Sequence, residues 1–200
     1  MITISDQLLS QPQVDQLKEF WNQNQDRVKT KFYGPEISKP DLRLIIHQHD
    51  DVYKLIKHVV DSMLPDQPKF YSAYERQHNP TPLHIDPTSV YTFIISLDED
   101  PRLKTLVWKE HFKSNEHWQN FVYSWQKPEI EPDFKISTAY PISHTYDENK
   151  ELYLADYLTL DGVFEYRLGT AACFLGNQVH CSGNWQDLIA SKDFVVVHTQ

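Results

Sequence analysis

Three residues, His84, Asp86 and His180, have the side-chain types and spacing of a metal site. His84 and Asp86 are separated by one residue and lie just before the apolar run 90–97. In an extended segment, residues two apart point to the same side, so both can bind one ion while Ile85 points away. Two imidazoles and one carboxylate on one face hold a mononuclear non-heme Fe(II) and leave the opposite face open for O₂ and a cosubstrate. We therefore predict that His84, Asp86 and His180 bind the metal and form the catalytic centre.

A second triplet of the same kind, His49-Asp50-Asp51, is interpreted differently. The residues that follow it are apolar at helical spacing from Val52 to Met63, and Pro65 comes next. Such a pattern predicts a helix that begins here, with Asp50 or Asp51 as its N-cap and His49 in solvent.

Several β-rich segments surround the first triplet. A turn-rich link, 77–82, precedes His84, and the predicted strands are 69–75, 90–97, 103–108, 169–180 and 191–198. The strand 169–180 is expected to be buried and to carry His180 at its end. The predicted ligands therefore lie at the ends of strands.

This order of elements resembles the prolyl-hydroxylase-like branch of the Fe(II)/2-oxoglutarate dioxygenases. The matching pieces, from residue 70 onward, are Tyr74, His84-Ile85-Asp86, the run 93–98, the Thr-containing run 105–108, the Gly-led run 169–174, His180 and Lys192. The resemblance implies a double-stranded β-helix of jelly-roll type. It also implies that Fe(II), 2-oxoglutarate and O₂ are used together.

Lys192 and Tyr74 are the residues expected to bind 2-oxoglutarate. The family places a cation on the last strand, and Lys192 stands at the start of that strand here. A carboxylate buried in an apolar barrel is very unfavourable without a cationic partner, so a lysine there would stabilise the distal carboxylate. The hydroxyl of Tyr74 could add a hydrogen bond.

The sequence departs from the family pattern in three places. Arg102-Leu103-Lys104 stands where a pair of glycines is common, Lys192 replaces the commoner arginine, and the insert 110–168 is long. Long insertions on a rigid frame often bind substrate, so we expect specificity there. Tyr91 and Trp108, on strands next to the ligands, are the expected substrate-wall residues, although core packing would explain them equally well.

The N-terminal part is expected to be helical. Two apolar stripes predict helices, one through Val14, Leu17, Phe20 and Trp21 and the other over 52–63, and 42–46 could add a strand. We predict an α+β, mainly β fold in one domain of 200 residues. Residues 1–68 would form a helical support that packs on the barrel, and residues 69–200 the barrel with its insert.

Composition excludes several classes of protein. A net charge of −9 disfavours nucleic-acid binding through phosphates. The sequence has no apolar run of membrane-spanning length, and its first residues do not resemble a signal peptide, so a cytoplasmic location is expected. Two cysteines, Cys173 and Cys181, are too few for a disulfide framework and are expected to be ordinary packed thiols.

The resemblance implies a hydroxylase that releases succinate and CO₂. Halogenating relatives lack the metal-binding carboxylate, so the presence of Asp86 favours hydroxylation. The expected substrate is an amino-acid side chain, prolyl-like, free or within a peptide. A cupin-like metal protein that does not use 2-oxoglutarate and a noncatalytic jelly-roll binding module remain open alternatives, and the sequence leaves the oligomeric state undetermined.

Overall fold

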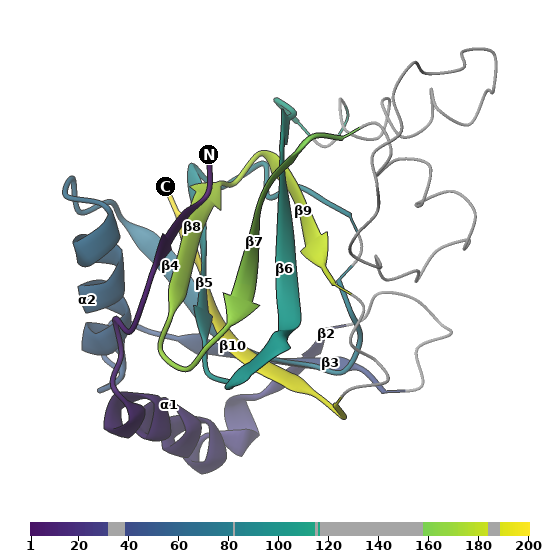
Figure 1. The fold of residues 1–200 in the computed structure, drawn as a ribbon. Helices are drawn as coiled ribbons and strands as arrows, with labels where there is room; N and C mark the ends of the chain where they lie inside the picture. The colour runs from purple at the N-terminus through teal and green to yellow at the C-terminus, as the bar shows by residue number, and fades with distance from the viewer. Residues whose placement is uncertain (32–38, 82, 115, 117–157, 184–188) are drawn as a thin grey trace.

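Two antiparallel β-sheets face each other in the structure, a computed structural model that describes residues 1–31, 39–81, 83–114, 116, 158–183 and 189–200 (Figure 1). The larger sheet has, in spatial order, β1 Thr3–Ser5, β8 Ala171–Leu175, β5 Tyr91–Ser96, β10 Lys192–Thr199, β4 Phe70–Gln77, β3 Asp41–Ile46 and β2 Lys29–Lys31. The smaller sheet has the order β7 Leu160–Tyr166, β6 Asp100–His111 and β9 Gln178–Ser182. This arrangement confirms the predicted jelly-roll fold.

Two helices cover the outer face of the larger sheet. They are α1 Gln11–Gln23 and α2 Tyr53–Met63, and a short 3₁₀ helix, Gln25–Arg27, follows α1. Ser10 and Gln13 form a capping box at the start of α1, which satisfies backbone N–H groups there. The apolar side chains of both helices pack with those of the sheet in one cluster, which includes Trp21 and Val59. No helix in the described part of the chain is long and apolar enough to cross a membrane.

The start of α2 differs from the prediction. Its N-cap is Val52, which makes no side-chain capping hydrogen bond, and not Asp50 or Asp51. Asp50 is instead engaged by Arg27, whose two terminal nitrogens lie 3.0 and 2.9 Å from its carboxylate oxygens. His49 is largely exposed, as expected.

The space between the sheets is filled by a second apolar cluster. Alternate residues of the central strands point inward, including Ala73, Ile94, Phe174 and Val196. A third cluster lies on the other face of the smaller sheet, where Leu106 and Trp108 pack against Leu83, Ile85 and Leu158. The strand parity therefore decides which side chains can reach the interior of the barrel.

Three parts of the chain differ from the prediction. Residues 169–180 form two strands, β8 and β9, which are joined at Gly176 and Asn177, so His180 lies within β9 and not at the end of one long strand. The predicted insert 110–168 contains β7, which pairs with β6, and its residues 117–157 lie outside the described part of the chain. The N-terminal 68 residues contribute β1, β2 and β3 to the larger sheet as well as the two helices.

Candidate metal centre and adjoining cavity

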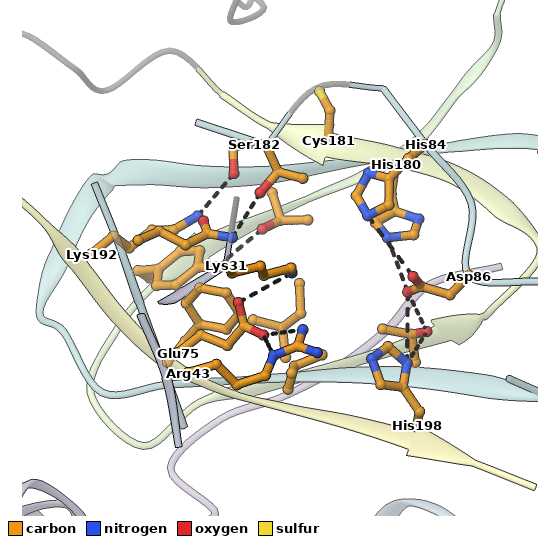
Figure 2. Close-up of a pocket in the computed structure, with 18 residues that line it drawn as sticks. Lys31, Arg43, Glu75, His84, Asp86, His180, Cys181, Ser182, Lys192 and His198 are labelled. Atoms are coloured by element: carbon orange, nitrogen blue, oxygen red, sulfur yellow. Dashed lines mark hydrogen bonds and ion pairs between the residues drawn. The ribbon is translucent and has the colours of Figure 1, made fainter. Parts of the chain in front are cut away.

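The structure brings the three predicted metal ligands together at one end of a cavity between the sheets (Figure 2). One side-chain ligand atom from each of His84, Asp86 and His180 lies within 4.8 Å of the others. The Nε2 atom of His180 is 3.3 Å from Asp86 Oδ2, and the Nε2 atom of His84 is 3.9 Å from Asp86 Oδ1. The two imidazole rings are 4.1 Å apart between centroids. Two nitrogens and one carboxylate oxygen can therefore converge on a single ion.

Backbone hydrogen bonds fix this convergence. His84 and His180 form an isolated antiparallel bridge in which each N–H donates to the other's carbonyl at 3.0 Å. The N–H of Asp86 donates to the carbonyl of Gly176 at 2.6 Å. A Cβ at position 176 would lie 2.4 Å from the carbonyl oxygen of Ser89, so the close approach requires glycine.

Side-chain hydrogen bonds orient two of the ligands. Nδ1 of His180 lies 2.9 Å from the Gln178 carbonyl and must donate to it. Nε2 then offers its lone pair to a metal ion when the ring is neutral, and it can donate to Asp86 when the ring is protonated. The hydroxyl of Thr92 donates to Asp86 Oδ2 at 2.8 Å. Outer partners of this kind hold metal ligands in their binding geometry.

The local charges favour an ionised Asp86. Burial by itself raises the pKa of its carboxyl group. The charge of a protonated His180 and its hydrogen bond lower that pKa, as do the charges of His84 and His198, and the lowering effects are the larger ones in total. The pKa of Asp86 therefore lies well below its usual range. The ionised carboxylate is the form that binds a cation.

The wall of the cavity is polar along much of its length. Its described lining consists of Lys31, Arg43, Glu75, Gln77, Thr81, His84, Asp86, Thr92, Ile94, Thr105, Tyr166, His180, Cys181, Ser182, Lys192, Phe194, Val196 and His198. The metal ligands and the predicted cosubstrate-binding Lys192 thus share one cavity.

Lys192 is almost fully buried, with 1% of its surface exposed. Its Nζ donates to Ser182 Oγ at 3.0 Å and lies 4.8 and 5.1 Å from the ring centres of Tyr166 and Phe194. Burial lowers the pKa of Lys192 to about 7, although the charges of Asp41 and Asp98 oppose that shift. A bound anion would favour the charged form of this amine.

Gln77 lies beside Lys192 in the sheet, because the two residues are partners in the register of β4 and β10. Its Nε2 donates to Thr81 Oγ1 at 2.7 Å, whereas its Oε1 is buried with no hydrogen-bond partner within the described residues. Buried polar atoms are normally satisfied, so this end of the cavity is suited to a polar guest.

Tyr74 does not reach the cavity, which corrects the expectation that it helps to bind 2-oxoglutarate. It pairs with Val195 in the register of β4 and β10, and its ring lies 4.6 Å from that of Trp21 on the helix side of the sheet. Its hydroxyl donates to Asp193 Oδ2 at 2.8 Å. Burial, together with the negative charge of Asp193, raises the pKa of Tyr74 far above its usual range.

The two expected substrate-wall residues also point elsewhere. Tyr91 packs against the helix-side cluster, while its neighbour Thr92 lines the cavity. Trp108 is buried in the third cluster, on the face of β6 opposite to Thr105. Their strands do flank the site, but successive side chains of a strand point to opposite faces, and these two point away from the cavity.

Sequence reasoning missed the charged residues that line the cavity from the N-terminal strands. Glu75 of β4 is 1% exposed and forms ion pairs with Arg43 of β3 and Lys31 of β2. His198 of β10 was also missed, and its Nδ1 lies 3.8 Å from Asp86 Oδ2. A glutamate within the β-rich run 69–75 was the available signal, because buried carboxylates are usually paired with cations.

The donor set fits a divalent transition metal with vacant coordination positions. Two imidazoles and one carboxylate from one side are the ligands that a non-heme Fe(II) site uses, and the cavity extends from them on the side of Lys192. The arrangement can bind an ion together with an anionic guest. The chemistry that the converging ligands support is that of a bound metal.

Comparisons with known proteins support the fold. No protein-family model matches the sequence, and no curated protein matches it. Solved structures do match. The non-heme alpha-ketoglutarate-dependent carbocyclase SnoK from nogalamycin biosynthesis has a TM-score of 0.63 and 12% identity, over 100% of this chain and 79% of that one.

Two further solved structures match over the whole of this chain. A prolyl-4-hydroxylase from Pseudomonas putida has a TM-score of 0.56 at 9% identity and is covered over 91% of its length. HygX from Streptomyces hygroscopicus, solved with nickel and 2-oxoglutarate bound, has a TM-score of 0.57 at 10% identity and is covered over 83%. The chain therefore has the jelly-roll fold on which these 2-oxoglutarate-dependent enzymes are built.

Proposed function

We propose that this chain is an Fe(II)- and 2-oxoglutarate-dependent dioxygenase that hydroxylates an amino-acid side chain, free or within a peptide. The observation that carries the proposal is that His84, Asp86 and His180 share one cavity with the buried amine of Lys192. A metal site alone would not require a buried cation nearby. A chelating dicarboxylate needs both, because one of its ends binds the metal and its other carboxylate needs a separate cation.

The metal ligands and Lys192 have separate roles in this proposal. His84, Asp86 and His180 would hold Fe(II), and Lys192 would bind the distal carboxylate of 2-oxoglutarate. The bound iron supplies the activation of O₂, in which one oxygen atom enters the substrate as a hydroxyl group and the other enters succinate as 2-oxoglutarate loses CO₂. Thr92 and Gln178 would keep the ligand side chains in place.

The burial of the lining residues indicates where the cosubstrate and the substrate would lie along the cavity. Lys192 is buried, as is Ser182, whereas His84 and Asp86 are partly exposed. The cosubstrate would therefore lie in the deep part and the substrate nearer the solvent side. With water excluded from the deep part, the interaction between Lys192 and a carboxylate is strengthened by the low local dielectric.

Hydroxylation is preferred among the oxidative reactions that this fold supports. Asp86 would be the third protein ligand, which would leave no position open for a halide in its place. Similar solved structures include a carbocyclase and an epimerase as well as a prolyl-4-hydroxylase. The amino-acid substrate follows the motif order that resembles the last of these.

Succinate formation tests the proposal. The purified protein, supplied with Fe(II), 2-oxoglutarate and O₂, should release succinate and CO₂ slowly without substrate and faster with it. His180→Ala and Lys192→Met should each lower the rate at least tenfold, whereas His49→Ala, which alters the other His-x-Asp triplet, should not. Metal binding without 2-oxoglutarate turnover would favour a cupin-like protein, and binding of neither would favour a noncatalytic module.

A further inference from the structure

A charged cluster on the cavity wall lies outside the roles given so far. It consists of Lys31, Arg43 and Glu75, from the adjacent strands β2, β3 and β4. Arg43 Nε donates to Glu75 Oε1 at 2.5 Å, and Lys31 Nζ lies 3.5 Å from Glu75 Oε2. All three residues line the same cavity as the metal ligands.

Exposure differs along this cluster. Glu75 is 1% exposed, whereas the side chains of Arg43 and Lys31 are 28% and 31% exposed. The carboxylate is therefore at the bottom, and the two cations extend toward solvent. In Figure 2, Lys31 and Arg43 extend from the side of Glu75 toward the side that holds Asp86 and His180.

The balance of charge indicates what this cluster binds. The described lining has three basic residues, Lys31, Arg43 and Lys192, and two carboxylates, Glu75 and Asp86. Basic residues therefore outnumber carboxylates in the described lining, in a chain whose net charge is −9. A group with a negative charge is therefore the ligand that this part of the lining favours.

We propose that Arg43 and Lys31 form a substrate-binding site for a carboxylate, so that the substrate is an acid held by its anionic group while its reacting carbon faces the metal. The inference rests on the proposed function and narrows its substrate class. Glu75 holds the guanidinium of Arg43 in one orientation, which reduces the entropy that Arg43 would lose when it binds an anion.

The consequence for the reaction is a requirement for a free carboxylate near the reacting carbon. A free amino acid, or the C-terminal residue of a peptide, meets that requirement. An internal residue without an acidic side chain does not, because its backbone carbonyl is part of a neutral amide. Arg43 would thus discriminate between substrates that differ by one charge.

Ligand binding without turnover tests this site. The protein loaded with Zn(II) and saturating 2-oxoglutarate is titrated with N-acetyl amino acids, which are monoanions, and with the matching neutral N-acetyl amino-acid amides, and binding is followed by saturation-transfer NMR. At least one acid should bind about tenfold or more tightly than its amide, since hydrogen bonds to charged groups are the stronger ones. Arg43→Gln should reduce that preference to threefold or less, and Arg43→Lys should retain part of it.

Two controls separate binding from folding. Arg102 also forms an ion pair, with Asp100, but it is exposed and lies outside the cavity lining. Arg102→Gln should therefore leave the preference for acids intact. Arg43→Gln leaves a buried Glu75 less well compensated, so the double variant Arg43→Gln/Glu75→Gln is measured as well. It should keep the fold, checked by its melting temperature, and should still lack the preference for acids.

Each contrary result has a distinct meaning. If acids and amides bind equally, if no acid binds, or if Arg43→Gln keeps the preference, the carboxylate site is wrong while the proposed function stands. Inorganic phosphate that binds more tightly than the acids, and is lost in Arg43→Gln, would replace carboxylate with phosphate as the ligand. If 2-oxoglutarate itself does not bind to the Zn(II)-loaded protein, the proposed function is wrong, and the comparison of acids with amides is then made without 2-oxoglutarate.

Discussion

His84 and His180, 96 residues apart in sequence, hold each other in place through two backbone hydrogen bonds of 3.0 Å. The bridge puts their rings 4.1 Å apart. Since the backbone of each histidine positions the other, the two imidazoles are set before any ion binds. The site is therefore preorganised by sheet pairing, and its outer partners can be tested one at a time.

Thr92→Val should weaken metal binding without unfolding the protein. The Thr92 hydroxyl donates to Asp86 Oδ2 at 2.8 Å, and valine has nearly the same shape but no donor. Loss of such an outer partner typically weakens metal affinity by about 10–100-fold. The check is the Fe(II) dissociation constant, measured anaerobically. Thr92→Ser restores the hydroxyl and should recover most of the affinity; equal affinity for all three proteins would contradict the assigned role.

Affinity for 2-oxoglutarate should fall as pH rises above about 7. Burial lowers the pKa of Lys192 to about 7, and a carboxylate binds to the protonated amine. Above that pKa the protein must take up a proton when the anion binds, so affinity should fall by up to about tenfold per pH unit. The check is calorimetry between pH 6 and 9. Lys192→Met should bind 2-oxoglutarate weakly at every pH, and a wild-type affinity independent of pH would contradict the role of Lys192.

The same residue should affect the stability of the protein without ligands. The folded pKa of Lys192 lies below that of a lysine in the unfolded chain, so the unfolded state binds more protons between about pH 7 and pH 10. The unfavourable burial of its charge is fully present below pH 7 and is relieved as pH rises. Lys192→Met should therefore stabilise the protein most at pH 6 and less at pH 9, as measured by urea unfolding. A stability difference that grows with pH would contradict this account.

Tyr74→Phe should lower stability and leave 2-oxoglutarate binding unchanged. The Tyr74 hydroxyl donates to the carboxylate of Asp193 on the helix side of the sheet, away from the cavity. Hydrogen bonds to charged groups contribute about 1.5–3 kcal/mol, so the free energy of unfolding should fall by an amount in that range. The check combines urea unfolding with 2-oxoglutarate calorimetry. Weaker 2-oxoglutarate binding would restore the role expected from the sequence.

The parts predicted well are those that local spacing determines. His84 and Asp86 are two residues apart in an extended segment, which is sufficient to put both side chains on one face. The stripes of α1 and α2 follow from helical periodicity, and the jelly-roll fold follows from the order of the motifs. The signals for the ligand pair and the helices lie within a few residues of the structure that they predict, whereas the fold was implied by the order of motifs along the chain.

The errors come from the register between strands. Tyr74, Tyr91 and Trp108 lie on the predicted strands but on their other faces. Each of these strands carries apolar side chains on both faces, because one face packs on another layer while the other faces the barrel interior. The pattern of apolar and polar residues along these strands therefore does not show which alternate residues point into the barrel.

The missed residues have a related cause. Arg43 and Lys31 come from strands of the N-terminal segment, and they reach the cavity because β2 and β3 extend the larger sheet beyond β4. The pairing of Arg43 with Glu75 joins residues 32 positions apart. No local pattern reports a contact of that kind.

Anaerobic titration with Fe(II), with and without 2-oxoglutarate, tests the central claim most directly. The wild-type chain should bind one Fe(II), and 2-oxoglutarate should bind with equal stoichiometry and more tightly once iron is present. His180→Ala should lose both properties, whereas His49→Ala should keep them. Full Fe(II) binding by His180→Ala, or 2-oxoglutarate binding that is indifferent to iron, would contradict the claim that His84, Asp86 and His180 hold the metal to which the cosubstrate binds.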